Sequence, residues 1–137
     1  MDSGHGRSGR AAAGWVPVLR RAVRRQLDGW GLAGLADDAT LVVGELATNA
    51  VRHGEPPVRV AVTLRCAPGV PRTVRIEVAD GGAGIDLDVV RAWWGHPAFP
   101  LGESGRGLYM VDAVSREWGD RSTSAGHTVW VDLAPTP

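Results

Sequence analysis

Glu45 and Asn49 are the residues best suited to chemistry, and they lie one helical turn apart in the segment 44–54. Side chains at this spacing share one face of a helix, and Arg52 continues that face. A carboxylate and a carboxamide placed in this way could hold a hydrated magnesium ion and a reacting water or hydroxyl, because magnesium prefers oxygen ligands and keeps several waters. The alternative is a solvated helix face that carries Glu and Asn without a ligand.

A second motif, Asp80-x-Gly82-x-Gly84, directly follows an alternating apolar run that predicts a strand. An aspartate at a strand end can accept a hydrogen bond from an exocyclic amine such as that of adenine. The glycines would allow a flat ring to lie against bare backbone. The alternative is an ordinary Asp-Gly turn.

A third motif, Gly105-Arg106-Gly107-Leu108, stands where a helix is expected to begin. Free N–H groups and the positive end of a helix dipole bind phosphates, and Arg106 could add a charge to a terminal phosphate. The alternative is a loop-to-helix junction that uses glycine for its turn geometry.

Two helices are predicted in the first part of the chain. The first covers 15–30, with Pro17 in its first turn, and its apolar stripe is Val16, Leu19, Val23, Leu27 and Trp30. The second runs from a cap at Asp37 or Asp38 to about Arg52, so it carries Glu45 and Asn49.

The rest of the chain predicts a hairpin of strands at 58–65 and 73–79, a short helix at 87–94, a loop at 95–105 and a third long helix at 107–118. Two short strands, at 120–124 and 127–133, finish the chain. This order indicates an α/β two-layer sandwich, in which a mixed, mostly antiparallel sheet carries three main helices on one face. We expect a disordered leader at 1–14 and one domain at 15–134.

The amino-acid composition excludes several classes of enzyme and binding site. The chain has 137 residues and no lysine, so all 15 of its Lys and Arg positions are arginine. Schiff-base enzymes, the lysine of a P-loop and the strand lysine of eukaryotic-type protein kinases are therefore excluded. The formal net charge is zero, which argues against bulk attraction to nucleic acid or to anionic lipid. The abundance of Arg, Ala, Gly and Val suggests a GC-rich bacterial genome.

The remaining features point to an intracellular protein. Cys66 is the single cysteine, so it forms no intrachain disulfide, and we expect it to be buried or half-buried. No two histidines have metal-ligand spacing, and no segment resembles a secretion signal or a membrane span. We expect a soluble cytoplasmic protein. An arginine face on the first helix favours a solvated surface over nucleic-acid binding, with docking of an acidic protein as an alternative (Arg20, Arg21, Arg24 and Arg25).

Taken in chain order, the three motifs and a late strand containing Thr128 resemble the GHKL (Bergerat-fold) superfamily of ATP-binding domains. Within it, the phrases 44–54, 105–111 and 117–119 are most similar to the small single-domain branch. That branch holds bacterial anti-sigma factors that are also serine kinases, with their actinobacterial relatives. The resemblance covers about 15–134.

The resemblance implies a role for each matching position. Asn49 would bind the Mg²⁺ that bridges the phosphates of ATP, and Glu45 would act as the general base. Asp80 would hydrogen-bond the adenine amine. The segment 95–104 would form a lid. The other implied nucleotide contacts are Arg52 and His53 near the phosphates or ribose, Gly82 and Gly84 around the base, Gly105, Arg106, Gly107 and Leu108 at the phosphates, and Thr128 under the adenine.

The implied function is that of an anti-sigma-type regulator that phosphorylates a serine or threonine on a protein antagonist. A non-catalytic ATP-binding module that acts through partner binding is the alternative. The implied partners are a regulatory protein, namely an antagonist or a sigma factor, and the resemblance allows a homodimer. We expect no direct contact with nucleic acid or membrane.

Overall fold

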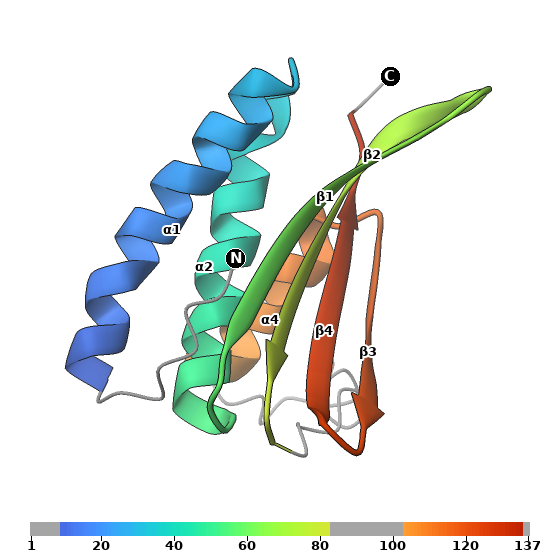
Figure 1. Ribbon diagram of the computed structural model, residues 1–137. Coiled ribbons are helices and arrows are strands. Elements are labelled where there is room, and N and C mark those ends of the chain that lie inside the picture. The colour runs from blue at the N-terminus through green and yellow to red at the C-terminus, as the bar shows by residue number, and fades with distance from the viewer. Residues whose placement is uncertain (1–8, 83–102, 136–137) are drawn as a thin grey trace, which may run out of the picture.

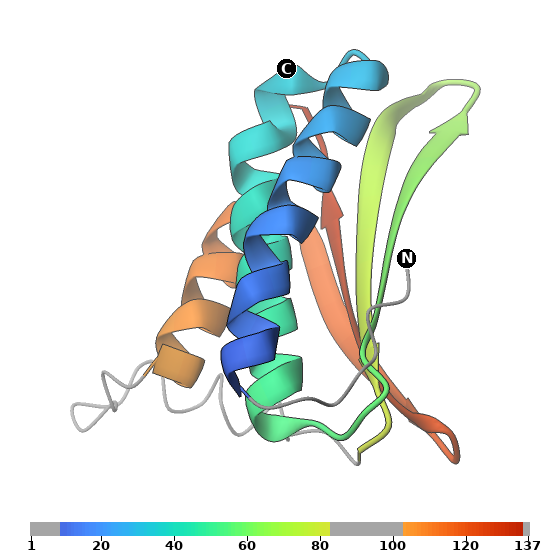
Figure 2. The same ribbon diagram turned by 60° about the vertical axis from the view of Figure 1, so that its left-hand side comes forward.

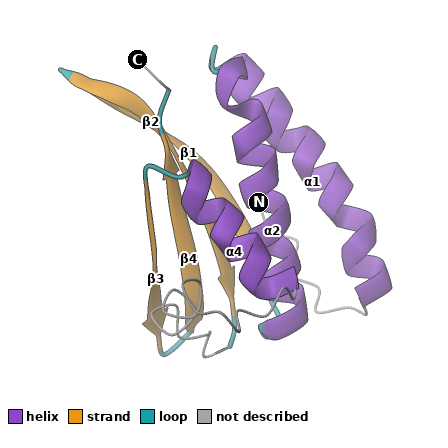
Figure 3. Ribbon diagram, turned by 180° about the vertical axis from the view of Figure 1, so that it is seen from behind, coloured by secondary structure: helices purple, strands orange, loops and turns teal. Residues whose placement is uncertain are grey.

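The computed structural model describes residues 9–82 and 103–135, and it shows three helices on one face of a sheet (Figures 1 and 3). The strands are β1 (Arg59–Ala67), β2 (Val70–Asp80), β3 (Glu117–Thr123) and β4 (Gly126–Leu133). Their order in the sheet is β1-β2-β4-β3, and all three pairings are antiparallel. The predicted two-layer α/β sandwich is confirmed, and so is the predicted hairpin.

Helix α1 (Gly9–Gly29) packs along α2 (Ala36–His53) (Figure 2). It begins before the expected domain start at Trp15, so Pro17 lies inside the helix, and its predicted place in the first turn is wrong. The helix continues past Pro17 because tertiary packing outweighs the lost backbone hydrogen bond. The residues that provide this packing are buried on the predicted stripe (Val16, Leu19, Val23 and Leu27).

A single 3₁₀ turn, η1 (Ala33–Leu35), leads directly into α2. The N-cap position therefore falls on Leu35, which makes no side-chain capping bond, and the predicted aspartate cap is wrong. Asp37 and Asp38 lie in the first helical turn, where carboxylates favour the helix dipole. Asp37 also accepts a hydrogen bond of 2.8 Å from Arg24 of α1.

Helix α4 (Glu103–Val114) packs against α2. It begins before the predicted boundary, so Glu103 and Ser104 are helical, although the sequence placed them in a loop. Trp118 was expected on this helix but lies in β3, where it is 7% exposed. Its indole Nε1 donates to Asp112 Oδ1 at 2.6 Å, which ties the strand to the helix. Position 118 also fits the helical spacing of Leu108, Val111 and Val114, so periodicity alone could not separate the strand from the helix. The predicted helix at 87–94 lies outside the described residues.

Apolar side chains from both layers form the core. Val60 of β1 and Val58, which directly precedes the strand, are buried, while Arg59 and Ala61 are exposed, as the alternation predicts. Cys66 lies further along β1 and is exposed, so the expected burial is wrong. The end of the β1–β2 hairpin projects away from the helices (Figure 1), and none of the described helices covers it there. None of the described helices is long and apolar enough to cross a membrane.

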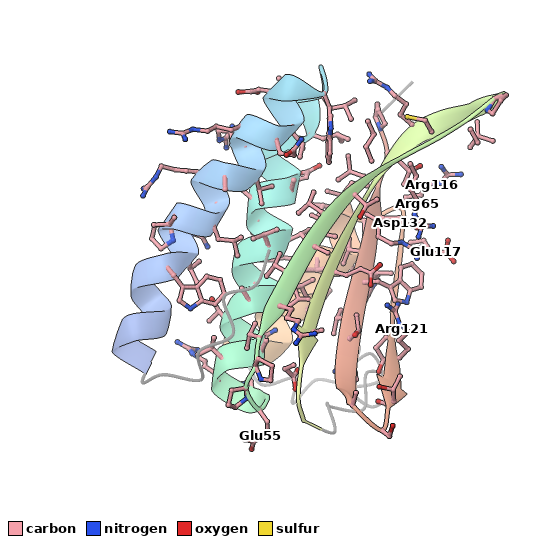
Figure 4. All side chains as sticks on the ribbon, viewed as in Figure 1. Glu55, Arg65, Arg116, Glu117, Arg121 and Asp132 are labelled. Carbon is pink, nitrogen blue, oxygen red and sulfur yellow. The ribbon has the colours of Figure 1, made fainter. Side chains whose placement is uncertain are left out.

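The face of the sheet away from the helices carries a charged cluster. Arg75 donates two hydrogen bonds to Asp132, of 2.7 and 2.8 Å, and its guanidinium lies 4.5 Å from the ring centre of Trp130. The hydrogen bond to Asp132 raises the pKa of Arg75 above its ordinary value. A second pair, Arg121 and Glu77, lies beside it at 2.6 Å. Figure 4 labels Arg121 and Asp132 on the side of the sheet away from α1.

We expect Asp132→Asn to lower the free energy of unfolding by about 1.5–3 kcal/mol, the range for hydrogen bonds to charged groups. The side chains of Arg75 and Asp132 are only 17% and 12% exposed, so solvent replaces the lost interaction poorly. Urea denaturation measures the change. Asp37→Asn is the matched control, because its pair with Arg24 is 92% and 49% exposed and such pairs contribute about 0–1 kcal/mol. Equal losses in the two variants would contradict the prediction.

Candidate functional site

A pocket lies between the C-terminal half of α2, helix α4 and the adjoining ends of β2 and β4. Among the described residues that line it, most are apolar and four carry polar side chains. The polar side chains are Asn49, His53, Asp80 and His127, and the remaining lining residues are Leu46, Ala50, Gly54, Val78, Leu108 and Val129. Four predicted site residues therefore meet in one place: Asn49, His53, Asp80 and Leu108. A concave, mainly apolar site with a few converging polar groups is typical of small-molecule binding.

Asp80 is the last residue of β2, and its two carboxylate oxygens have different surroundings. Oδ1 accepts hydrogen bonds from the backbone N–H of Gly82 at 2.7 Å and of Glu55 at 3.3 Å. No hydrogen bond within the described part of the chain uses Oδ2. The loop thus fixes the carboxylate through one oxygen and leaves the other able to accept a bond from a ligand.

The end of α2 approaches this loop closely. A side chain at Gly54 would collide with the Asp80 carboxylate, and one at Gly81 would meet the carbonyl oxygen of Pro56 at 2.6 Å. Gly81 also donates its N–H to the carbonyl of Glu55. Figure 4 shows Glu55 beyond the end of α2, with its side chain directed away from the molecule. Glycine is needed at both close approaches, and together they place Asp80 beside the last turn of α2.

Asn49 carries an unsatisfied group. Its amide nitrogen Nδ2 is buried and has no hydrogen-bond partner among the described residues. Leaving a buried amide unpaired costs about 1–3 kcal/mol, so native proteins rarely keep one without a reason. An unpaired carboxamide in a pocket lining suits a ligand rich in oxygen atoms.

Glu45 lies one turn before Asn49 on α2, and it does not line the pocket. Its carboxylate lies against the backbone of Gly107 in α4, where any added Cβ would collide with Oε2. Helix α4 can approach α2 this closely because residue 107 is glycine. The first and third sequence motifs are therefore in contact, as a shared site requires.

Some of the other predicted site residues lie away from the pocket, and some lie outside the described residues. Both Arg52 and His53 are exposed in the last turn of α2, but His53 lines the pocket and Arg52 does not. Gly82 belongs to the Asp80 loop. Gly105 and Arg106 lie near the start of α4, but the side chain of Arg106 lies outside the described residues. Gly84 and most of the proposed lid also lie outside them.

Thr128 does not line the pocket that contains Asn49. The strand alternation gives the reason. Val131 and Leu133 of β4 are buried toward the helices, so His127 and Val129 face the same way, while Thr128 shares the opposite face with Trp130. Thr128 lines a second hollow, together with Asp80 and Arg59.

His127 is a polar residue of the pocket that was not predicted from the sequence. It is 3% exposed and hydrogen-bonded through Nε2 to Asp120 Oδ2 at 2.7 Å. The period-two pattern that identifies Val129, Val131 and Leu133 as inward-facing also includes position 127, and this signal could have found it. The described residues contain no cluster of three or more His, Cys, Asp or Glu side chains that could hold a metal.

These groups fit a nucleotide. The apolar walls suit a base, Asp80 Oδ2 suits an exocyclic amine, and the unpaired Asn49 Nδ2 suits a phosphate oxygen. The carbonyl oxygen of Asn49 is the atom suited to a hydrated cation beside the phosphates. Among the described residues, the predicted magnesium ligand is the Asn49 carboxamide, so most ligands of the ion would come from phosphate and water, as magnesium prefers.

Comparisons with known proteins agree with this geometry. The family model described as "histidine kinase-like ATPase domain" matches residues 10–133. A solved histidine kinase domain, from a blue-light activated histidine kinase of Erythrobacter litoralis EL346, is similar in fold, with a TM-score of 0.50 and 19% identity. The match covers 90% of this chain and 60% of that one, so this chain spans a little over half of that structure's length. A search of curated proteins finds no match. The family match extends over nearly the whole chain, and the protein therefore belongs to the histidine kinase-like ATPase domain family.

Proposed function

We propose that this protein binds Mg-ATP in the described pocket and transfers phosphate to a serine or threonine of a regulatory protein partner, as an anti-sigma-type kinase. The observation that carries the proposal is the meeting of Asn49, with its unpaired buried amide, and Asp80, with its free Oδ2, in one apolar pocket. The family to which the chain belongs supports nucleotide binding. The partner would be an antagonist or a sigma factor, and the setting would be the cytoplasm.

Bound ATP would supply an activated terminal phosphate, with Mg²⁺ neutralising its charge. The chain's own residues would then have three tasks. Asp80 would hold the amine of the base, and the Asn49 carboxamide would orient the hydrated ion. Glu45 would take the proton from a substrate hydroxyl. Its carboxylate lies at the backbone of Gly107, so it is held beside the segment whose N–H groups are suited to phosphate.

The arginines on α1 give little support to the alternative of nucleic-acid binding, because some of them contact α2. Arg24 is paired with Asp37 of α2. Arg20 lies across Gly44 of α2, where a Cβ would collide with its guanidinium. Two of the four arginines therefore serve helix–helix packing.

We expect Glu45→Gln to slow phosphotransfer by about 10²–10⁴-fold while ATP affinity changes little, because a general base contributes about that much and Glu45 does not line the pocket. The assay would follow transfer of label from γ-labelled ATP to the regulatory proteins encoded beside this gene. Calorimetry would measure ATP affinity for both forms. Glu117→Gln, an exposed acidic residue of β3, is the matched control.

A second candidate function, the non-catalytic ATP-binding module, is favoured by one observation: Glu45 lies outside the pocket lining. If the wild-type protein binds ATP but labels none of the acceptors, this module is the better description. If calorimetry detects no ATP binding, both functions are excluded.

A further inference from the structure

His127 is a buried polar side chain that the proposed mechanism does not use. In the β2–β4 register it lies directly opposite Asp80. Residues opposite each other in antiparallel strands point to the same face, with Cβ atoms about 4.5–5.5 Å apart. Both side chains line the pocket. The strand ends therefore bring a carboxylate and an imidazole to the same part of the site.

Asp120 determines which ring nitrogen of His127 can bind a ligand. An ionised carboxylate only accepts hydrogen bonds, so Nε2, which lies 2.7 Å from Asp120 Oδ2, must carry a hydrogen and donate it. In the neutral ring, Nδ1 is then a lone-pair acceptor. No hydrogen bond of the described residues uses Nδ1, and it is not among their buried unpaired atoms. In the neutral ring it is therefore an acceptor that no described residue uses.

Gly126 holds this part of β4 against the Asp80 loop. Its φ of +148° is in the region that favours glycine, and a Cβ there would collide with the carbonyl oxygen of Asp80. The residue before His127 thus touches the residue opposite it. This contact and the Asp120 bond both restrict how His127 can move relative to Asp80.

We propose that His127 reads the nucleobase together with Asp80. The inference rests on the proposed function, because it requires a nucleotide in this pocket. Nδ1 and Asp80 Oδ2 are two acceptors, and they match the two hydrogens of a 6-amino group on a purine. A 6-oxo group would present a third acceptor, and neither His127 Nδ1 nor Asp80 Oδ2 can donate a hydrogen bond to it. The pair therefore selects 6-aminopurine nucleotides over 6-oxopurine nucleotides.

The test compares ATP with inosine triphosphate, which has the same sugar and phosphates but a 6-oxo group. His127→Phe keeps a flat ring and removes both nitrogens. We expect it to weaken ATP binding by about 3- to 10-fold, the range for one neutral hydrogen bond, and to leave inosine triphosphate binding unchanged or tighter. Ser122→Ala is the matched control, because Ser122 is exposed and pairs with His127 across the hairpin. We expect it to keep the wild-type ratio of the two affinities.

A second measurement needs no variant. In ¹⁵N NMR spectra of the ligand-free protein, His127 Nδ1 should have the shift of an unprotonated ring nitrogen. ATP should move this signal toward that of a hydrogen-bonded acceptor, and inosine triphosphate should not.

Three results would overturn the inference: a protonated Nδ1 in the free protein, an equal effect of His127→Phe on both nucleotides, or a discrimination lost in Thr128→Val but kept in His127→Phe. If the wild-type protein still binds ATP in any of these cases, and Asp80→Asn weakens that binding, only the role of His127 is disproved. If neither nucleotide binds the wild-type protein, the proposed function fails with it.

Discussion

Replacing Asp80 with asparagine is expected to weaken ATP binding by about 10- to 100-fold, because hydrogen bonds to charged groups contribute about 1.5–3 kcal/mol and about 1.4 kcal/mol is tenfold. Asparagine keeps Oδ1, so the bonds from Gly82 and Glu55 can remain. At the other position it places a donor where the carboxylate offered an acceptor. The amine of the base then meets N–H groups. Isothermal titration calorimetry measures the change in affinity.

Glu77→Gln is the matched control for Asp80→Asn. It removes the same charge from the same strand, but Glu77 lies on the face away from the helices, where it pairs with Arg121. We expect wild-type ATP affinity in this variant. Equal weakening by the two variants would show that net charge, and not recognition at the strand end, governs binding.

We expect Gly126→Ala to lower the free energy of unfolding by about 2–6 kcal/mol, since a strained backbone and an overpacked contact each cost about 1–3 kcal/mol. Position 126 has a positive φ, and its added Cβ would collide with the carbonyl oxygen of Asp80. The β3–β4 turn would have to move away from the Asp80 loop. Urea denaturation measures the loss.

Gly69→Ala separates the two causes. Gly69, in the β1–β2 turn, has a φ of +75°, but nothing lies within 4 Å of an added Cβ. Only the left-handed backbone is strained there, which costs about 1–2 kcal/mol. A loss at Gly126 no larger than the loss at Gly69 would mean that the contact with Asp80 has no effect on stability.

Much of the fold could be predicted because its signals are local. The alternation of Val58 and Val60 with exposed residues, and the helical spacing of Leu19, Val23 and Leu27, depend only on neighbouring positions. The helix ends could not be predicted as well. The start of α2 is set by the η1 turn that directly precedes it, which a search for an aspartate cap does not indicate. Helix α1 extends through Pro17 because α2, which is distant in sequence, covers its apolar stripe.

The candidate site, too, has features that the local sequence indicates and features that depend on packing. Asn49 and Asp80 were identifiable by type and spacing, and the structure places both in one pocket. The register of β4 in the sheet decides which of its side chains face the helices. The motif match alone therefore could not show that His127, and not Thr128, lines that pocket. The closeness of Glu45 to Gly107 depends on how α2 and α4 pack, and no local pattern carries that information.

The ladder between β2 and β4 has one further consequence. Asp80 and His127 face the pocket only because the two strands pair in this register, and a slip of one residue in either strand would turn one of the two side chains to the opposite face of the sheet. A misregistered molecule could have normal secondary structure and still lack the site. The fraction of a preparation that can be saturated with ligand would therefore count the correctly folded molecules, which circular dichroism alone cannot do.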